Sequence, residues 1–191
     1  FYIIFSQFSA FAINDAVQQS IAAHSSNKKK VDFDKITGFC ICLVSGTATA
    51  VLLFACAPFI GGIIDSSSVG LGLKWASAGI LFFTLNKVLL ASLNGQRKIK
   101  LYCIIQMLRS LLMFMCVVFI VLNHMPAHML GVIFTFSEVA VLVPLVFLSV
   151  YPRLALPSFG QIKQNIKKHL RFSVRAFPNA LLAEAYLKID I

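Results

Sequence analysis

The sequence predicts an all-α protein, a polytopic bundle of transmembrane helices. Hydrophobic residues make up 59% of the 191 residues and charged residues only 13%, and the mean hydropathy is +0.85. A soluble domain has about a quarter of its residues charged, so this composition excludes one. Intrinsic disorder is excluded because so apolar a chain does not stay solvated. Five cysteines in a chain of this length also exclude a disulfide-stapled secreted module.

Six apolar stretches of about 20 residues or slightly more follow one another along the chain. The predicted spans are 1–23, 36–58, 73–93, 99–122, 129–150 and 168–191. At about 1.5 Å per residue each is long enough for a hydrocarbon core about 30 Å thick. Apolar and polar residues do not alternate along these stretches as they do along the strands of a membrane β-barrel. The chain begins and ends inside apolar runs, so we expect a fragment of a longer protein.

The positively charged residues predict which connections face the cytoplasm. Three connections, 24–35, 94–100 and 151–168, carry most of the 17 Lys and Arg residues, and the other two, 59–72 and 123–128, carry none. Cytoplasmic loops of membrane proteins carry an excess of Lys and Arg, so we place these three basic loops in the cytoplasm. Topology and anionic lipids then explain the net charge of +10. No nucleic-acid partner is expected, because no basic stripe has aromatic residues interleaved.

The connection 151–168 differs from the other loops. Two prolines and a glycine interrupt any helix in its first half, and a short amphipathic stretch on the inner membrane surface is expected to follow. We therefore predict a cytoplasmic linker at 151–167. It joins a first group of spans in 1–150 to a second group that starts with 168–191.

Four polar side chains lie in the first predicted span. Gln7, Asn14 and Gln18 fall within about 40° of one another at about 100° per residue, and Asp15 is beside them. One polar stripe on an apolar helix is typical of a helix that lines a watery or ligand-filled cavity. The alternative is a helix buried among others through hydrogen bonds. We favour the cavity because four polar groups exceed what packing needs.

Charged residues at mid-membrane depth need a reason, since each costs about 2.5–3.5 kcal/mol to insert. Arg109 lies about ten residues into its span, and Glu138 has a similar depth in the next. One interpretation is an ion pair that holds two helices together. The other is that Arg109 meets an anionic substrate while Glu138 titrates or binds a cation. Lys87 lies nearer the inner end of its span, so we expect it to snorkel to the interface.

Two further features concern helix continuity and packing. In the last span Arg175 lies one turn before Pro178, which is expected to kink or interrupt the helix near a substrate path. In the second span small residues recur at a spacing of three to four, which predicts close helix packing. These residues are Gly38, Cys42, Ser45, Gly46 and Thr49.

The sequence contains no recognisable catalytic constellation. Cys40 and Cys42 form a C-x-C without a matching Cys/His pair, so no zinc site is expected. Gly-rich phosphate loops and nucleophile elbows are missing from the sequence. Asp32 and Asp34 have lysines beside them and are interpreted as part of an ordinary solvated loop. We therefore expect a protein that is not an enzyme and has no metal or cofactor.

Three segments carry a family resemblance. Residues 16–24 precede a Lys-rich loop, residues 90–98 combine small, Gly and basic residues, and residues 172–191 run from Phe-Ser through Pro-Asn to Ile-Asp. Together with the topology and the linker position, they resemble the polysaccharide flippases of the MOP/MATE exporter superfamily, the Wzx-like translocases. They look like the end of that family's second helix, its turn between helices four and five, and the start of its seventh helix.

The resemblance implies a fold and a function. Residues 1–150 would be the N-terminal lobe, with family helices two to six and the first helix missing, and 168–191 would start the C-terminal lobe of a two-lobed transporter. Such a protein lies in the plasma (inner) membrane and works by alternating access. It would flip undecaprenyl-diphosphate-linked oligosaccharide units to the outer leaflet for O-antigen, capsule or exopolysaccharide synthesis. Its expected partners are the lipid-linked oligosaccharide, membrane lipids, and the polymerase and other assembly proteins.

The resemblance also implies a cationic central cavity, to which seven residues are assigned. Arg109 and Arg175 are the expected ligands of the diphosphate, because an Arg fork binds two phosphate oxygens and stays charged. The expected ligands of the sugar hydroxyls are Gln7, Asn14 and Gln18. The carboxylates that could couple transport to an ion are Asp15 and Glu138.

Other functions stay open at this point. A MATE-type cation-coupled drug antiporter would require an acidic cavity. Asp15 and Glu138 favour this function, and the deep arginines Arg109 and Arg175 argue against it. A lipid II flippase is a close relative of the predicted family. A polyprenyl-phosphate sugar transferase is less favoured, because it would need clustered acidic residues at a cytoplasmic membrane edge.

Overall fold

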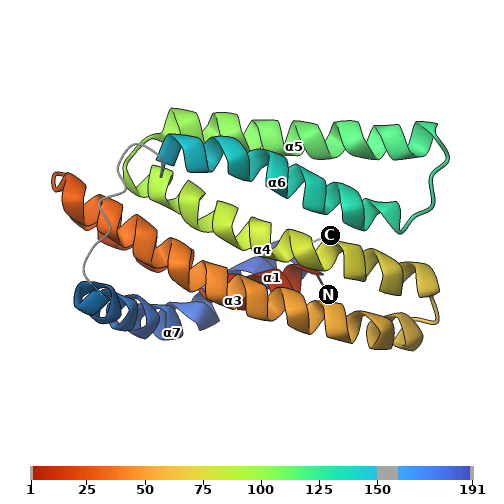
Figure 1. Ribbon diagram of the computed structural model, residues 1–191, viewed down its shortest axis with the longest axis horizontal. Helices are drawn as coiled ribbons and strands as arrows, with labels where there is room; N and C mark the ends of the chain where they lie inside the picture. Colours follow the sequence, from red (N-terminus) through yellow and green to blue (C-terminus); the bar gives the residue numbers. More distant parts are fainter. Residues whose placement is uncertain (1, 150–158, 190–191) are drawn as a thin grey trace.

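The computed structural model describes residues 2–149 and 159–189, and this part of the chain is helical, with no β-strand (Figure 1). The prediction of an all-α protein is confirmed. Its helices are α1 (Tyr2–Ala10), α2 (Ile13–Ala23), α3 (Lys28–Ile63), α4 (Ser67–Gly95), α5 (Ile99–Leu122), α6 (Met129–Ser149) and α7 (Phe159–Ile189).

In the described part of the chain, four helices are long and apolar enough to cross a membrane, namely α3, α4, α5 and α6. They correspond to four of the six predicted spans. The first predicted span is divided between α1 and α2, and the last lies within α7, which carries more charged residues. Several apolar helices of this length indicate a multi-pass membrane protein.

The prediction of one continuous helix over 1–23 is wrong. The chain breaks at Phe11 and Ala12, whose φ values of 43° and 53° lie in the left-handed region. Non-glycine residues rarely adopt this conformation, and it ends an α-helix. The Ser45 hydroxyl of α3 donates to the main-chain oxygen of Ser9 at 2.8 Å. This bond from a neighbouring helix gives a partner to a carbonyl at the end of α1.

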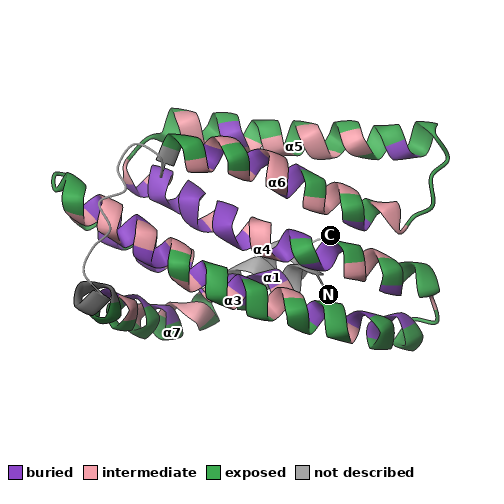
Figure 2. Cartoon of the chain, in the orientation of Figure 1, coloured by how far each residue is buried: buried purple, intermediate pink, exposed green. Residues whose placement is uncertain are grey.

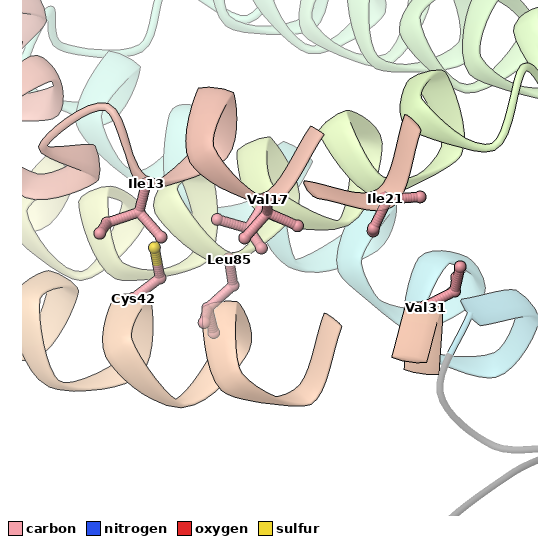
Figure 3. Close-up of a cluster of buried hydrophobic side chains, with 7 residues drawn as sticks. Ile13, Val17, Ile21, Val31, Cys42 and Leu85 are labelled. Atoms are coloured by element: carbon pink, nitrogen blue, oxygen red, sulfur yellow. The ribbon is translucent and has the colours of Figure 1, made fainter. Parts of the chain in front are cut away.

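The helix α4 is the centre of the bundle (Figure 2). Buried residues follow it over most of its length, whereas much of α3 and α5 is exposed. Exposed apolar side chains on a transmembrane helix are typical of a lipid-facing surface. Close to α4, one cluster of buried side chains joins it to α2 and α3 (Figure 3). Its members are Ile13, Val17, Ile21, Val31, Cys42, Leu85 and Val88.

The small residues predicted to pack α3 against its neighbours do so. A Cβ atom on Gly38 would collide with Val17 of α2, and one on Gly46 would lie 3.0 Å from Leu81 Cδ1 of α4. Between them Cys42 is fully buried. The backbones of α2, α3 and α4 can approach closely because these positions carry little or no side chain.

A second close contact, between α4 and α6, was not predicted. A Cβ atom on Gly131 would collide with the main-chain oxygen of Gly72 and would lie 3.1 Å from the Ala76 nitrogen. One turn further along α6, the Thr135 hydroxyl donates to the main-chain oxygen of Trp75 at 2.7 Å. The two helices are therefore in backbone contact at this point.

The last helix, α7, begins at Phe159 rather than at residue 168. The amphipathic stretch that was expected in the linker is its N-terminal part, and the helix continues through Pro178. Residues 150–158, the first half of the predicted linker, lie outside the described residues. In Figure 1, the N-terminal part of α7 lies below α3, on the side away from α5 and α6, and the helix then passes behind α3.

Candidate functional site

A half-buried cation lies beside the break between α1 and α2. Lys87 of α4 is half-buried, and its ammonium group donates to Gln7 Oε1 at 2.9 Å. Gln7 is only 7% exposed. Lys87, which had been expected to snorkel to the interface, thus has a hydrogen-bond partner on α1. The helix α4 continues for two further turns beyond Lys87, and Gln7 offers the ammonium group a polar partner inside the bundle.

Two residues of the first turn of α2 complete this polar group. Asn14 donates to Asp15 Oδ1 at 2.6 Å, and the Asp15 carboxylate interacts electrostatically with Lys87. A carboxylate is favoured in the first turn of a helix because the main-chain N–H groups there are unpaired. We call Gln7, Asn14, Asp15 and Lys87 the Lys87 cluster. The tertiary structure thus brings two of the predicted site residues, Gln7 and Asp15, to one cation, and Asn14 bonds to Asp15.

Gln18 lies one turn after Asn14 and is half-buried. Its main-chain oxygen is 2.7 Å from the position that a Cβ atom on Gly95 would take. The end of α4 is therefore in backbone contact with α2 at Gln18. This contact holds α2 against the helix that carries Lys87.

Arg109 and Glu138 form the ion pair that was one of the two interpretations of the sequence. Arg109 Nη2 lies 2.5 Å from Glu138 Oε1, with the Glu138 side chain fully buried and the Arg109 side chain 18% exposed. Asn86 of α4 donates to Glu138 Oε2 at 2.9 Å and to the main-chain oxygen of Glu138 at 2.8 Å. The pair therefore joins α5 to α6 and, through Asn86, to α4.

One aromatic ring lies near both cations. The Arg109 guanidinium carbon is 4.8 Å from the centroid of the Phe83 ring, and Lys87 Nζ is 5.9 Å from the same centroid. Both distances are within the range of a cation–π interaction. Phe83 thus connects the Arg109–Glu138 pair to the Lys87 cluster.

Arg175, the other predicted phosphate ligand, lies exposed on α7. Two residues further on, Phe177 stacks on Phe11, with ring centroids 4.7 Å apart and an interplanar angle of 26°. Phe177 also contacts Phe8 at a centroid distance of 5.4 Å. The segment of α7 that carries Arg175 is therefore anchored at the break between α1 and α2.

Reasoning from the sequence missed Asn86 and Phe83, and it interpreted Lys87 as a snorkelling residue and not as part of a site. A signal was present, because Asn86 and Lys87 are adjacent polar residues inside an apolar span. A single helix does not show whether such residues face lipid, water or protein. Among the residues whose side chains are described, no three His, Cys, Asp or Glu side chains come together as metal ligands would.

Comparison with known proteins gives one match. The family model described as "Polysaccharide biosynthesis protein" matches residues 1–191. No curated protein and no solved structure matches the chain. The family match covers all the residues, including the broken first helix, the four apolar helices and α7. The chain therefore belongs to the polysaccharide biosynthesis protein family.

Proposed function

We propose that this protein is a flippase, a membrane transporter rather than an enzyme. It moves undecaprenyl-diphosphate-linked oligosaccharide units from the inner to the outer leaflet of the inner membrane by alternating access, for O-antigen, capsule or exopolysaccharide synthesis. Membership of a polysaccharide biosynthesis family and four apolar helices support a transporter role. The observation that carries the proposal is the Lys87 cluster beside a broken helix, because transporters bind substrates where helices are interrupted.

The diphosphate is the part of this substrate that needs a cation. Lys87 is bound by the neutral amide of Gln7 and interacts with the Asp15 carboxylate, and the arriving phosphate oxygens replace Gln7 as its partner. Arg175 approaches from α7 as the second ligand. Arg109 is held by Glu138, and its contact with phosphate requires that pair to open.

The remaining polar residues suit the sugar and the coupling ion. Gln7, Asn14 and Gln18 carry amides that can donate to and accept from sugar hydroxyls. Asp15 is repelled by the negative charge of the incoming diphosphate, so it binds a proton or a cation as the substrate enters. Glu138 is the other carboxylate proposed for ion coupling. The polymerase and other assembly proteins are the proposed protein partners.

The runner-up is a MATE-type cation-coupled drug antiporter, and Asp15 is the observation that favours it, since it is a half-buried carboxylate. A cationic drug would bind there in place of Lys87. A lipid II flippase would use the same cluster for the same diphosphate. A polyprenyl-phosphate sugar transferase stays the least favoured.

The test is complementation with the full-length reading frame in a bacterial strain that lacks its O-unit flippase. Restored surface polysaccharide, with no lipid-linked units accumulating on the inner leaflet, is the expected result. Ion-dependent export of cationic dyes by the same cells, without surface polysaccharide, would establish the antiporter instead.

Replacing Lys87 with methionine is expected to lower transport about 10- to 100-fold, because a charge-assisted hydrogen bond contributes about 1.5–3 kcal/mol. Transport is measured as surface polysaccharide per unit of membrane-inserted protein. Lys100→Met is the matched control, since Lys100 is exposed at the start of α5. Lys87→Arg keeps the charge and should recover part of the activity. Equal transport by the Lys87→Met and Lys100→Met variants would rule out a role for Lys87 in binding.

A further inference from the structure

Asp34 is fully buried, although it lies near the start of α3 and had been expected in a solvated loop. Ser20 of α2 donates to Asp34 Oδ2 at 2.8 Å. Asn165 of α7 donates to Oδ1 at 2.8 Å, and His169 Nε2 lies 3.4 Å from the same oxygen. Donors on both oxygens stabilise the ionised carboxylate. The consecutive helices α2 and α3 and the helix α7, which is far from both in the sequence, therefore meet at one carboxylate.

The N-terminal part of α7 has two different faces. Asn165, His169 and Ser173 follow one another at a spacing of four and are all buried. The opposite face carries Lys163, Lys167 and Arg171, which are exposed. The side of α7 that contacts the bundle here is therefore polar, whereas packing between helices is usually apolar or made of small residues.

A third α7 residue, Lys168, contacts the same group of side chains. Lys168 donates to the Ser20 hydroxyl at 3.3 Å, and Asn165 Nδ2 also lies 3.4 Å from the Thr37 hydroxyl. We call Ser20, Asp34, Asn165 and His169 the Asp34 lock. Further along α7, Phe177 stacks on Phe11.

A polar contact of this kind differs energetically from an apolar one. Removing one partner while the other stays buried is costly, because a charge or a hydrogen-bonding group is left without a partner. Moving α7 away as a unit returns Asp34 and His169 to water together, so most of the lost interactions are replaced by hydration. The contact therefore specifies where α7 sits without making its departure prohibitively costly.

We propose that the Asp34 lock is a reversible docking site for α7 on α2 and α3, which we call the seat of α7. The helix α7 leaves this seat and returns to it as the protein works. The seat is independent of the substrate. The part that concerns the working cycle rests on the proposed transport function, in which a second group of helices moves relative to the first.

The seat can be tested without any transport measurement. Ser173 is fully buried and its hydroxyl has no hydrogen-bond partner. The substitution Ser173→Cys therefore places a thiol on the buried face of α7 with little disturbance of the structure. The full-length protein in lipid nanodiscs is treated with a water-soluble maleimide, and labelling of residue 173 is followed by peptide mass spectrometry. The labelling rate is proportional to the fraction of time that α7 is away from its seat. Arg171→Cys, at an exposed position, gives the rate of full access.

Asp34→Asn in the Ser173→Cys protein is expected to raise the labelling rate at least about tenfold, which corresponds to about 1.4 kcal/mol. The matched control is Asp32→Asn. Asp32 lies on the same helix, 3.2 Å from Lys35, and is not one of the four residues of the lock. Its variant should label within about twofold of the parent. Asn165→Ala removes the α7 side of the contact and leaves α3 intact, so it tests the lock even if Asp34→Asn does not fold.

Three results would overturn the proposal. Equal labelling in the parent, Asp34→Asn and Asn165→Ala proteins would mean that the lock does not hold α7. Labelling of the parent as fast as at Arg171→Cys would mean that α7 is not seated. No labelling of the parent over hours, with normal labelling at Arg171→Cys, would mean that the seat does not release. None of these depends on which substrate the protein carries.

Discussion

Replacing Arg109 with methionine is expected to lower the free energy of unfolding by about 3 kcal/mol, because Glu138 would stay buried as an unpaired charge. Asn86 would still donate to Oε2, but an amide does not neutralise a carboxylate. The measurement is unfolding of the purified full-length protein by titration with SDS in mixed micelles. Arg97→Met is the matched control, because Arg97 is exposed in the turn between α4 and α5. A variant at Arg109 as stable as this control would contradict the prediction.

The double variant Arg109→Met with Glu138→Met separates two roles of the pair. Its stability is expected to recover most of the loss, because no charge is left buried. Transport by the same protein then shows what Arg109 does. If transport returns with stability, the pair serves only to hold α5 to α6. If transport stays lost while stability returns, one of the two side chains takes part in transport, Arg109 at the diphosphate or Glu138 in ion coupling.

Replacing Gly131 with alanine is expected to destabilise the bundle by about 2 kcal/mol, because its methyl group would collide with the backbone of α4. A flexible side chain could move aside, but the Gly72 carbonyl and the Ala76 nitrogen belong to the central helix. The helices α4 and α6 must separate or shift, and this also disturbs the Asn86–Glu138 contact. SDS titration of the purified protein measures the effect, and the yield of membrane-inserted protein should fall with it.

Gly62 provides the comparison for this substitution. It lies near the end of α3, and a Cβ atom there would meet nothing within 4 Å. Gly62→Ala should therefore leave the protein unchanged or stabilise it by up to about 1 kcal/mol, since alanine favours the helix over glycine. Equal destabilisation by both substitutions would mean that the contact between α4 and α6 is not responsible.

Much of the architecture could be predicted from the sequence. The helices α3 to α6 follow from apolar stretches longer than any soluble helix requires, because only a bilayer accommodates such surfaces. The packing of α3 followed from its small residues, since Gly38, Cys42 and Gly46 recur on one face of a helix. The pairing of Arg109 with Glu138 was one of two open interpretations, because a charge at mid-membrane depth requires either a partner or a substrate.

The break in the first helix could not be predicted. Phe11 and Ala12 are neither glycine nor proline, and nothing local forces them into the left-handed region. The tertiary structure compensates the break, through the hydroxyl of Ser45 and the stacking of Phe177 on Phe11. These partners lie far away along the chain.

The sequence by itself determined that the chain is all-helical and apolar enough for a membrane, which helices have to be long, and where close packing is possible. These properties depend on residues near one another in the chain. Only the tertiary structure decided that Lys87 is half-buried and Asp34 fully buried, each with polar partners on other helices. The local sequence around a charged residue near the end of an apolar span is the same whether its side chain reaches water or binds partners inside the bundle. Its environment is set by donors and acceptors on other helices, such as Gln7 for Lys87 and Asn165 for Asp34.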